Sequence, residues 1–456
     1  MNMQTRYLAA RRTQAPARGQ RGLATLVIVA ILFFVLSMVA AYTNRNLIFE
    51  QRTATNQLRS TQALEAAEAG VEWALAMLNA GRVDAGACAP TADLASDTFR
   101  QRYLTADTGT GLVTVRPVMG SGALARAWPT CVQNGTDWTC VCPATTSATP
   151  AAPTGDGVAP AFRMRFVQVA GTARSGTVWL QVNGCTRMES TCLDFPAVGG
   201  VASVSAGEGR VRIEVLVALK PVLSSLPLAA VTVRGDLLVN GNLTAANPTR
   251  SGSGIAVLAG GSIGDDANLS LSGPAGTPLD IATLRLASDS ALATLTMPAP
   301  SPVTSGDRFF SAVHGAWPLD HRDQPATLRI DCSAVCDADR LRTLAARNPG
   351  RVLWADGDVS LSGTASLGTA TAPVALVVTG DLSIDDITVF GYVHGSANTW
   401  TLTGNGGTVR GALLASNDLT IPVGAAVSVL RDAEVLDVLR TQHGSFVRVP
   451  GGWRDF

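Results

Sequence analysis

The feature that most constrains this chain is the uncharged run "GLATLVIVAILFFVLSMVAAYTN" between Arg21 and Arg45. A helix crosses the ~30 Å core of a bilayer with about 20 apolar residues, at about 1.5 Å per residue. The run is long enough and predicts a transmembrane helix. Its anchor residues are Leu23, Leu26, Ile28, Ile31, Phe33, Phe34, Leu36 and Met38.

The flanks of this run set its orientation. Five arginines precede or border it, namely Arg6, Arg11, Arg12, Arg18 and Arg21. Positively charged flanks remain in the cytoplasm, so the rest of the chain is expected to be exported. A cleaved secretion signal with a site at Val39-Ala40-Ala41 is the alternative, although its apolar region is normally only about 7–15 residues long.

Helical patterning continues beyond the apolar run. Between Thr61 and Leu78, apolar residues recur at steps of three and four and predict one buried stripe. The stripe consists of Leu64, Ala67, Val71, Leu75 and Leu78. No proline lies between Leu23 and Ala80, and Gly81 is a plausible stop. One helix over 23–80, about 85 Å long, is expected.

Composition points to a β-rich body after this helix, and hence to an α+β chain. With 45 glycines, 23 prolines and 5% aromatic residues, the sequence favours turns and small-residue strands over a helical bundle. The net charge is zero, so nothing indicates a nucleic-acid partner.

The eight cysteines are expected to form disulfides, because the body is predicted to be exported. They are Cys88, Cys131, Cys140, Cys142, Cys185, Cys192, Cys332 and Cys336. Zinc binding and free thiols are the alternatives, but no CxxC pair or neighbouring histidine completes a zinc site. The spacing of Cys185 with Cys192, and of Cys332 with Cys336, indicates two small loops. The other pairings stay open.

Two β-rich regions follow the helix, over 81–226 and 227–456. The first contains β-leaning runs at 112–118, 162–169, 177–182 and 211–219, and a low-complexity loop at 143–157.

The second region repeats a short apolar strand, a polar corner with Gly-Asp and another strand. Asp358 and Asp381 occupy equivalent places 23 residues apart, which is close to one coil of a β-solenoid. A glycine-rich β-sandwich is the alternative. The stretch 280–350 interrupts the repeats, and a short helix is expected over 337–346, ended by Asn348-Pro349-Gly350.

No catalytic or metal centre is expected. Asp236, Asp358 and Asp381 stand beside glycine, where an aspartate usually bonds a turn backbone. The adjacent pairs Asp265-Asp266 and Asp385-Asp386 point to opposite faces if they lie in strands. Calcium is conceivable at 355–360 through Asp356 and Asp358, but no bidentate glutamate follows.

The histidines form no recognisable ligand motif. His314, His321, His394 and His443 are scattered along the sequence. Each is expected at the surface or in packing.

The N-terminal segment has a family resemblance. Arg21-Gly22 before an apolar run resembles the class III signal of type IV prepilins, and Ala66-Ala67-Glu68-Ala69-Gly70 resembles the "AAEAG" helix of PilX-like minor pilins. The resemblance covers about positions 18–80. It implies a leader over 1–22 that is cut by a prepilin peptidase between Gly22 and Leu23, and an inner-membrane helix with a periplasmic body. It also implies partners: the inner-membrane assembly platform, the major pilin, other minor pilins and a tip adhesin.

One position departs from the family pattern. Major pilins carry a glutamate five residues into the mature chain, and this position is Val27 if Leu23 comes first. The departure favours a specialised tip or initiation subunit that promotes pilus assembly or adhesion. A signal-anchored or secreted β-helical adhesin or carbohydrate-binding protein is the alternative. A β-helical glycan enzyme would need clustered carboxylates.

Overall fold

The computed structural model describes residues 21–84, 86–116, 128–143, 149–154, 158–169, 176–195, 208–249, 254–264, 266–275, 281–297 and 303–455. The chain divides into two compact units, residues 1–59 and residues 60–456. The division falls within the first helix, α1 (Arg21–Leu78). The predicted leader lies outside the described residues except at its last two positions, which belong to α1.

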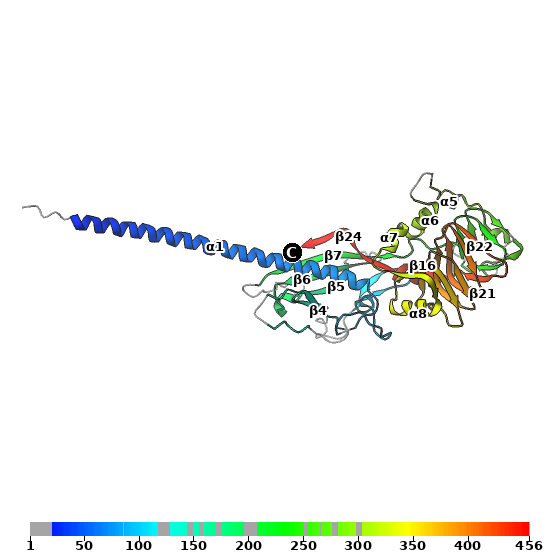
Figure 1. The fold of residues 1–456 in the computed structure, drawn as a ribbon, viewed down its shortest axis with the longest axis horizontal. Helices are drawn as coiled ribbons and strands as arrows, with labels where there is room; N and C mark the ends of the chain where they lie inside the picture. The colour runs from blue at the N-terminus through cyan, green and yellow to red at the C-terminus, as the bar shows by residue number, and fades with distance from the viewer. Residues whose placement is uncertain are drawn as a thin grey trace, which may run out of the picture. The chain divides into compact units, whose positions relative to one another are not determined.

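The long helix expected from the sequence is confirmed, since α1 runs without a break from Arg21 to Leu78 (Figure 1). It contains a segment long and apolar enough to cross a membrane, with a mean hydropathy of 2.9 over 18 residues. Asn79 ends the helix. Its side-chain amide donates to the carbonyls of Leu75, at 2.8 Å, and Phe446, at 2.9 Å. Phe446 lies in the last strand, β24 (Gly444–Asp455), so this end of α1 is bonded to the C-terminal part of the chain.

The second half of α1 packs on an antiparallel sheet of six strands. Its order is β24-β7-β6-β5-β3-β4. The strands are β3 (Thr130–Asn134), β4 (Asp137–Val141), β5 (Ala161–Val167), β6 (Thr177–Cys185), β7 (Arg210–Pro221) and β24 (Gly444–Asp455). The runs predicted at 162–169, 177–182 and 211–219 are β5, β6 and β7. Strand β24 was assigned to the C-terminal region by the sequence, but it pairs with β7 along its length.

Smaller elements surround this sheet. Helix α2 (Phe99–Tyr103) leads into a two-stranded sheet of β1 (Leu104–Ala106) and β2 (Val113–Val115), and α3 (Ser190–Leu193) follows β6. The run predicted at 112–118 contains β2.

The C-terminal region is solenoid-like, as the sequence predicts: sixteen strands join one sheet system, almost entirely through parallel pairs. Parallel ladders of this kind are not those of the alternative antiparallel sandwich. The strands are β8 (Val231–Val233), β9 (Leu237–Val239), β10 (Asn242–Ala246), β11 (Val257–Ala259), β12 (Ile263–Gly264), β13 (Leu269–Ser272), β14 (Arg285–Leu286), β15 (Thr327–Asp337), β16 (Val352–Ser362), β17 (Val374–Val378), β18 (Leu382–Asp385), β19 (Thr388–Gly395), β20 (Thr399–Thr403), β21 (Asn405–Ala415), β22 (Asp418–Ile421) and β23 (Ala426–Leu430).

The coils stack in an order that differs from the order of the chain. Coils from β15 to β21 follow one another, but β21 then pairs with β8, so that Leu413 lies opposite Val231. Strand β8 pairs in turn with β11, and β11 with β14. The stretch 280–350, predicted to interrupt the repeats, contains the connection that leads from β14 back to β15, but it also contains these two strands, which pair with other coils. The solenoid therefore consists of two runs of coils joined at the β21–β8 pair.

Helices occupy the connections. They are the 3-10 helix η2 (Asp266–Asn268), α4 (Ile281–Leu284), α5 (Ser290–Ala293), α6 (Ser305–His314), α7 (Pro318–Arg322), α8 (Ala338–Arg347) and α9 (Ala433–Gln442). The predicted helix over 337–346 is α8, and the Asp337 side chain caps it by accepting from the backbone of Arg340.

Among the described residues, four apolar clusters hold this unit together, and three of them are large. One fills the solenoid interior around Trp400, and one lies between α1 and the antiparallel sheet. In the third, Phe309 and Phe310 of α6 and Leu436 of α9 cover the outer side of the coils. Alternate residues of strands such as β21 serve the inner and outer cores, because neighbouring side chains in a strand point to opposite faces.

Candidate functional sites

The first half of α1 presents apolar side chains on every side. All eight predicted anchor residues are exposed, from Ile28 at 58% to Phe33 at 72%. No described residue of the first unit covers them. A uniformly apolar helix of this kind requires lipid or other helices around it. The segment can therefore serve as a membrane anchor and as a helix-packing surface.

The second half of α1 packs directly on the sheet through small residues. Ala63, Ala66, Ala67, Gly70 and Ala74 are buried against β5 and β6. The predicted stripe was centred differently, because Leu64 and Leu75 lie at the edge of the contact and are only partly buried. The small residues form its centre because the backbones approach closely there.

The lack of space for a Cβ atom at two glycines shows how closely the helix and the strands approach each other. A Cβ at Gly184 of β6 would lie 2.2 Å from the carbonyl oxygen of Ala63 and 2.5 Å from the nitrogen of Ala67. A Cβ at Gly70 would lie 2.6 Å from Val182 Cγ1. The "AAEAG" sequence thus has a structural reason: Ala66, Ala67 and Gly70 leave room for the strands, and Glu68 faces outward.

All eight cysteines form disulfides, which confirms this part of the sequence analysis. The pairs are Cys88–Cys142, Cys131–Cys140, Cys185–Cys192 and Cys332–Cys336. The last two close the small loops that their spacing indicated. Three bridges lie beside or within the antiparallel sheet and one spans a bulge in β15.

The corner aspartates bind backbone groups of neighbouring coils. Oδ1 of Asp358 accepts from the nitrogen of Asp381 at 2.9 Å, and Oδ1 of Asp381 accepts from that of Thr401 at 3.0 Å. Asp418 and Asp236 repeat this arrangement further along the stack. The sequence predicted backbone bonding in turns, whereas the bonds in the structure join successive coils.

The adjacent aspartates that the sequence analysis singled out do not form paired sites. Asp385 accepts from the backbone of Asn405, and Asp386 has a left-handed backbone, with φ of 48°. Asp265 lies outside the described residues.

The possible calcium ligands already have protein partners. Asp356 accepts from the indole of Trp354 at 2.8 Å and pairs with Arg329 at 3.4 Å. Asp358 Oδ1 accepts the hydrogen bond from the backbone nitrogen of Asp381. Among the described residues, no group of three or more histidine, cysteine or acidic side chains is arranged to hold a metal ion.

The histidines are less scattered in space than in sequence. His314, His321 and His394 meet beneath α6 and α7, and the ring centroids of His314 and His394 are 5.2 Å apart. All four histidines are buried, so the expectation of packing holds and that of surface positions is wrong. Sequence spacing could not reveal this cluster, because α6 and α7 are brought to β19 by the long connection from β14.

Hydrogen bonds link the histidines of this cluster through the hydroxyl of Tyr392. The carbonyl of Val222 can only accept, so His314 Nδ1 donates to it at 2.8 Å. His314 Nε2 lies 2.9 Å from the hydroxyl oxygen of Tyr392, and that oxygen lies 2.6 Å from His394 Nδ1. His394 Nε2 is hydrogen-bonded to the Ser416 hydroxyl at 2.7 Å.

Burial makes the charged form of these histidines costly. Burial, together with the neighbouring His321, lowers the pKa of His394 to about 3. Burial likewise lowers the pKa of His321 and of His443 to about 4. Their ordinary pKa is about 6.5. Protonation therefore opposes folding in mildly acidic solution.

Comparison with known proteins bears on the N-terminal helix. The model of the PilX N-terminal family matches residues 21–72. The chain carries a PilX-type pilin N-terminus. No curated protein matches the chain.

Two solved structures are among those that resemble the chain. The competence-associated pilin ComZ from Thermus thermophilus has 12% identity and a TM-score of 0.20, with 87% of this chain and 98% of that chain covered. A glycosylated ice-binding protein from an Arctic yeast has 12% identity and a TM-score of 0.21, with 46% and 94% covered. At these scores neither structure carries an argument about this chain.

The PilX-type helix combines the features on which the family resemblance rests. Its apolar half is exposed, its "AAEAG" half is packed on the body, and the two are one continuous helix. Residues 21–72 are thus related to the N-terminal segment of PilX-type pilins. Cleavage between Gly22 and Leu23 stays a prediction.

Proposed function

We propose that this chain is a minor pilin of a type IV pilus that acts at the pilus tip or in the initiation complex, where it promotes pilus assembly or adhesion. The observation that carries the proposal is the PilX-type helix, with its exposed apolar half and its body-bound second half. Such a helix suits both lipid and a bundle of like helices, because it is apolar on all sides.

Two features support a tip or initiation position. Beyond the antiparallel sheet, the second unit carries a solenoid-like region with sixteen strands, a large addition for a subunit repeated along a fibre. Val27 also stands where the family resemblance places the glutamate of major pilins. A subunit that caps the assembly needs contacts with neighbours on one side only, and it can carry a bulky domain on the other.

These assignments predict the order of processing and assembly steps. Prepilin peptidase cuts between Gly22 and Leu23, and the residues from Leu23 to Tyr42 hold the chain in the inner membrane with its body in the periplasm. The assembly platform then brings it together with other minor pilins, the major pilin and a tip adhesin. We assign it no catalytic role, since the corner carboxylates are bonded to backbone groups of neighbouring coils.

Immunogold labelling of sheared pili tests the position. An antibody against the solenoid-like region should label pilus ends, and deletion of the gene should reduce the number of pili per cell. A Gly22→Ser variant serves as the control: if cleavage occurs there, the variant stays in the membrane and the pili carry no label. Label spread evenly along the fibres would contradict a tip or initiation position.

A further inference from the structure

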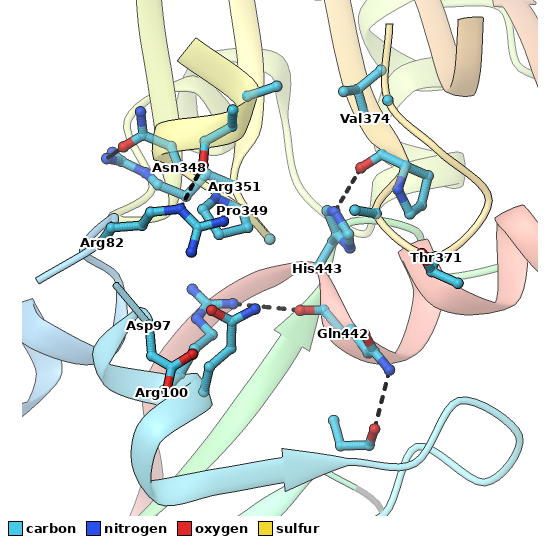
Figure 2. A pocket seen from close by; sticks show the side chains of 18 of the residues that line it. Arg82, Asp97, Arg100, Asn348, Pro349, Arg351, Thr371, Val374, Gln442 and His443 are labelled. Atoms are coloured by element: carbon cyan, nitrogen blue, oxygen red, sulfur yellow. Dashed lines mark hydrogen bonds between the residues drawn. The ribbon is translucent and has the colours of Figure 1, made fainter. Parts of the chain in front are cut away.

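A cavity of about 610 Å³ lies between the first region of the body and the solenoid-like region. The segment after α1, helix α2, the loop after α8 and the start of β24 contribute to its wall. Figure 2 shows Arg82 and Arg351 on one side of it, His443 on the other, and Arg100 with Gln442 below. Its volume falls within the roughly 300–1,000 Å³ of small-molecule sites.

The charge of the wall is strongly positive. Five arginines line the cavity, Arg82, Arg100, Arg116, Arg342 and Arg351, whereas Asp97 is its one acidic residue. Among the described residues, Arg342 alone of the five forms an ion pair, with Asp339 outside the cavity. The other four cations form no ion pair in the described part of the chain, although the charge of Arg82 acts on the carboxylate of Asp93.

Backbone carbonyls hold three of these arginines in place. Arg100 donates to the carbonyls of Leu78, at 2.9 Å, and Gly444, at 3.1 Å. Arg82 donates to that of Ala346 at 2.8 Å, and Arg351 to that of Thr327 at 3.2 Å. Neutral carbonyls orient a guanidinium group but leave its charge in place.

The guanidinium groups are therefore held close together, and some of their N–H donors remain available to a ligand. Each guanidinium has five N–H donors, so the carbonyl bonds use only part of them. Arg351 Nε is buried without a partner in the described residues. Arg100 is only 7% exposed, and both burial and the neighbouring charge of Arg351 lower its pKa, to about 10. An anion between these groups would relieve their repulsion.

The loop after α8 is shaped around Arg100. Gly350 has a φ of 81°, and a Cβ there would lie 3.1 Å from Arg100 Nη1. The glycine thus allows the loop to pass close to the guanidinium and to place Arg351 beside it. Hydroxyl and amide side chains, such as Thr371 and Gln442, complete the wall.

We propose that this cavity binds a small hydroxylated oxyanion, the size of a sugar acid or sugar phosphate, through Arg82, Arg100 and Arg351. The arginines supply paired donors for a carboxylate or phosphate group, and the hydroxyl and amide groups of the wall suit the polar remainder. The site stands on the geometry of the body alone and does not depend on the pilus role.

Isothermal titration of the full chain in detergent micelles tests the site, with glucuronate, glucose 6-phosphate and glucose as probes. We expect one equivalent of glucuronate or glucose 6-phosphate to bind, and glucose not to bind. Comparison of the two anions shows whether the site takes a carboxylate or a phosphate. Binding should weaken at least tenfold in Arg351→Gln and in Arg82→Gln. The matched control is Arg347→Gln, which removes an exposed arginine that does not line the cavity.

Two results would overturn the proposal. One is that neither anion binds the unaltered chain. The other is that both variants, with thermal unfolding midpoints showing that they fold, bind the anion as tightly as the Arg347→Gln control.

Discussion

The close packing of α1 on β6 makes Gly184 the most sensitive position of the interface. In Gly184→Ala, the added methyl group would lie 2.2 Å from the Ala63 carbonyl oxygen and 2.5 Å from the Ala67 nitrogen. Carbon atoms in contact are about 3.5–4.0 Å apart, so α1 would have to move from the sheet by roughly 1 Å. Both clashing atoms belong to the helix backbone, and no side-chain rotation relieves them.

The expected loss of stability follows from this shift. Overpacking usually costs about 1–3 kcal/mol, and we place Gly184→Ala at the upper end of that range. Gly70→Ala should cost less, because its new contacts are with the side chains of Val182 and Phe162 rather than with backbone, and because alanine favours a helix over glycine by about 1 kcal/mol.

Urea unfolding of the full chain in micelles, followed by tryptophan fluorescence, measures these differences. The ring centroids of Trp73 and Phe162 are 5.9 Å apart at this interface, so the fluorescence of Trp73 reports on the packing of α1 against the sheet. The control is Gly109→Ala, whose Cβ would lie 3.6 Å from its nearest neighbour and should change the unfolding free energy by less than about 0.5 kcal/mol. If Gly184→Ala is as stable as this control, close backbone packing does not hold α1 on the sheet.

Two further predictions concern stability. Because the pKa of His443 is lowered to about 4, the unfolded chain takes up a proton below pH 6.5 that the folded chain does not, so the body loses stability as pH falls from about 6.5 towards 4. Between pH 8 and pH 5, this histidine accounts for a loss of about 2 kcal/mol in the free energy of unfolding. In His443→Gln, the free energy measured by urea unfolding should therefore fall by about 2 kcal/mol less over the same pH range. An unchanged pH dependence would refute the assignment. The Cys88–Cys142 bridge spans 54 residues and the Cys332–Cys336 bridge spans 4. Replacing each pair by serine should cost about 4 and about 2 kcal/mol respectively, and the reverse order in unfolding would contradict the loop-closure argument.

Much of the fold could be predicted because it follows from local patterns. The continuous helix follows from the absence of proline and from the apolar periodicity that continues beyond the uncharged run, and the repeat of Asp358 and Asp381 follows from the coil length. Helix α8 follows from its cap at Asp337 and its Asn-Pro-Gly end. In each case the signal and the structure lie within a few residues of each other.

The parts that escaped prediction depend on distant pairings. The junction of Leu413 with Val231 and the return of β24 to β7 are both set by tertiary packing, which leaves no periodic trace in the sequence. The same holds for the meeting of His314 with His394. The arginine cavity escaped for a related reason, since Arg100 and Arg351 come from separate regions of the chain.

The mature N-terminus tests the central claim most directly. Intact mass and N-terminal peptide mapping of the protein from its native membrane or from sheared pili would locate it. A chain that begins at Leu23, with its amino group methylated, is the result that the pilin account predicts. A chain that begins near Tyr42, or that retains Met1, would contradict processing as a pilin and with it the proposed place in a pilus.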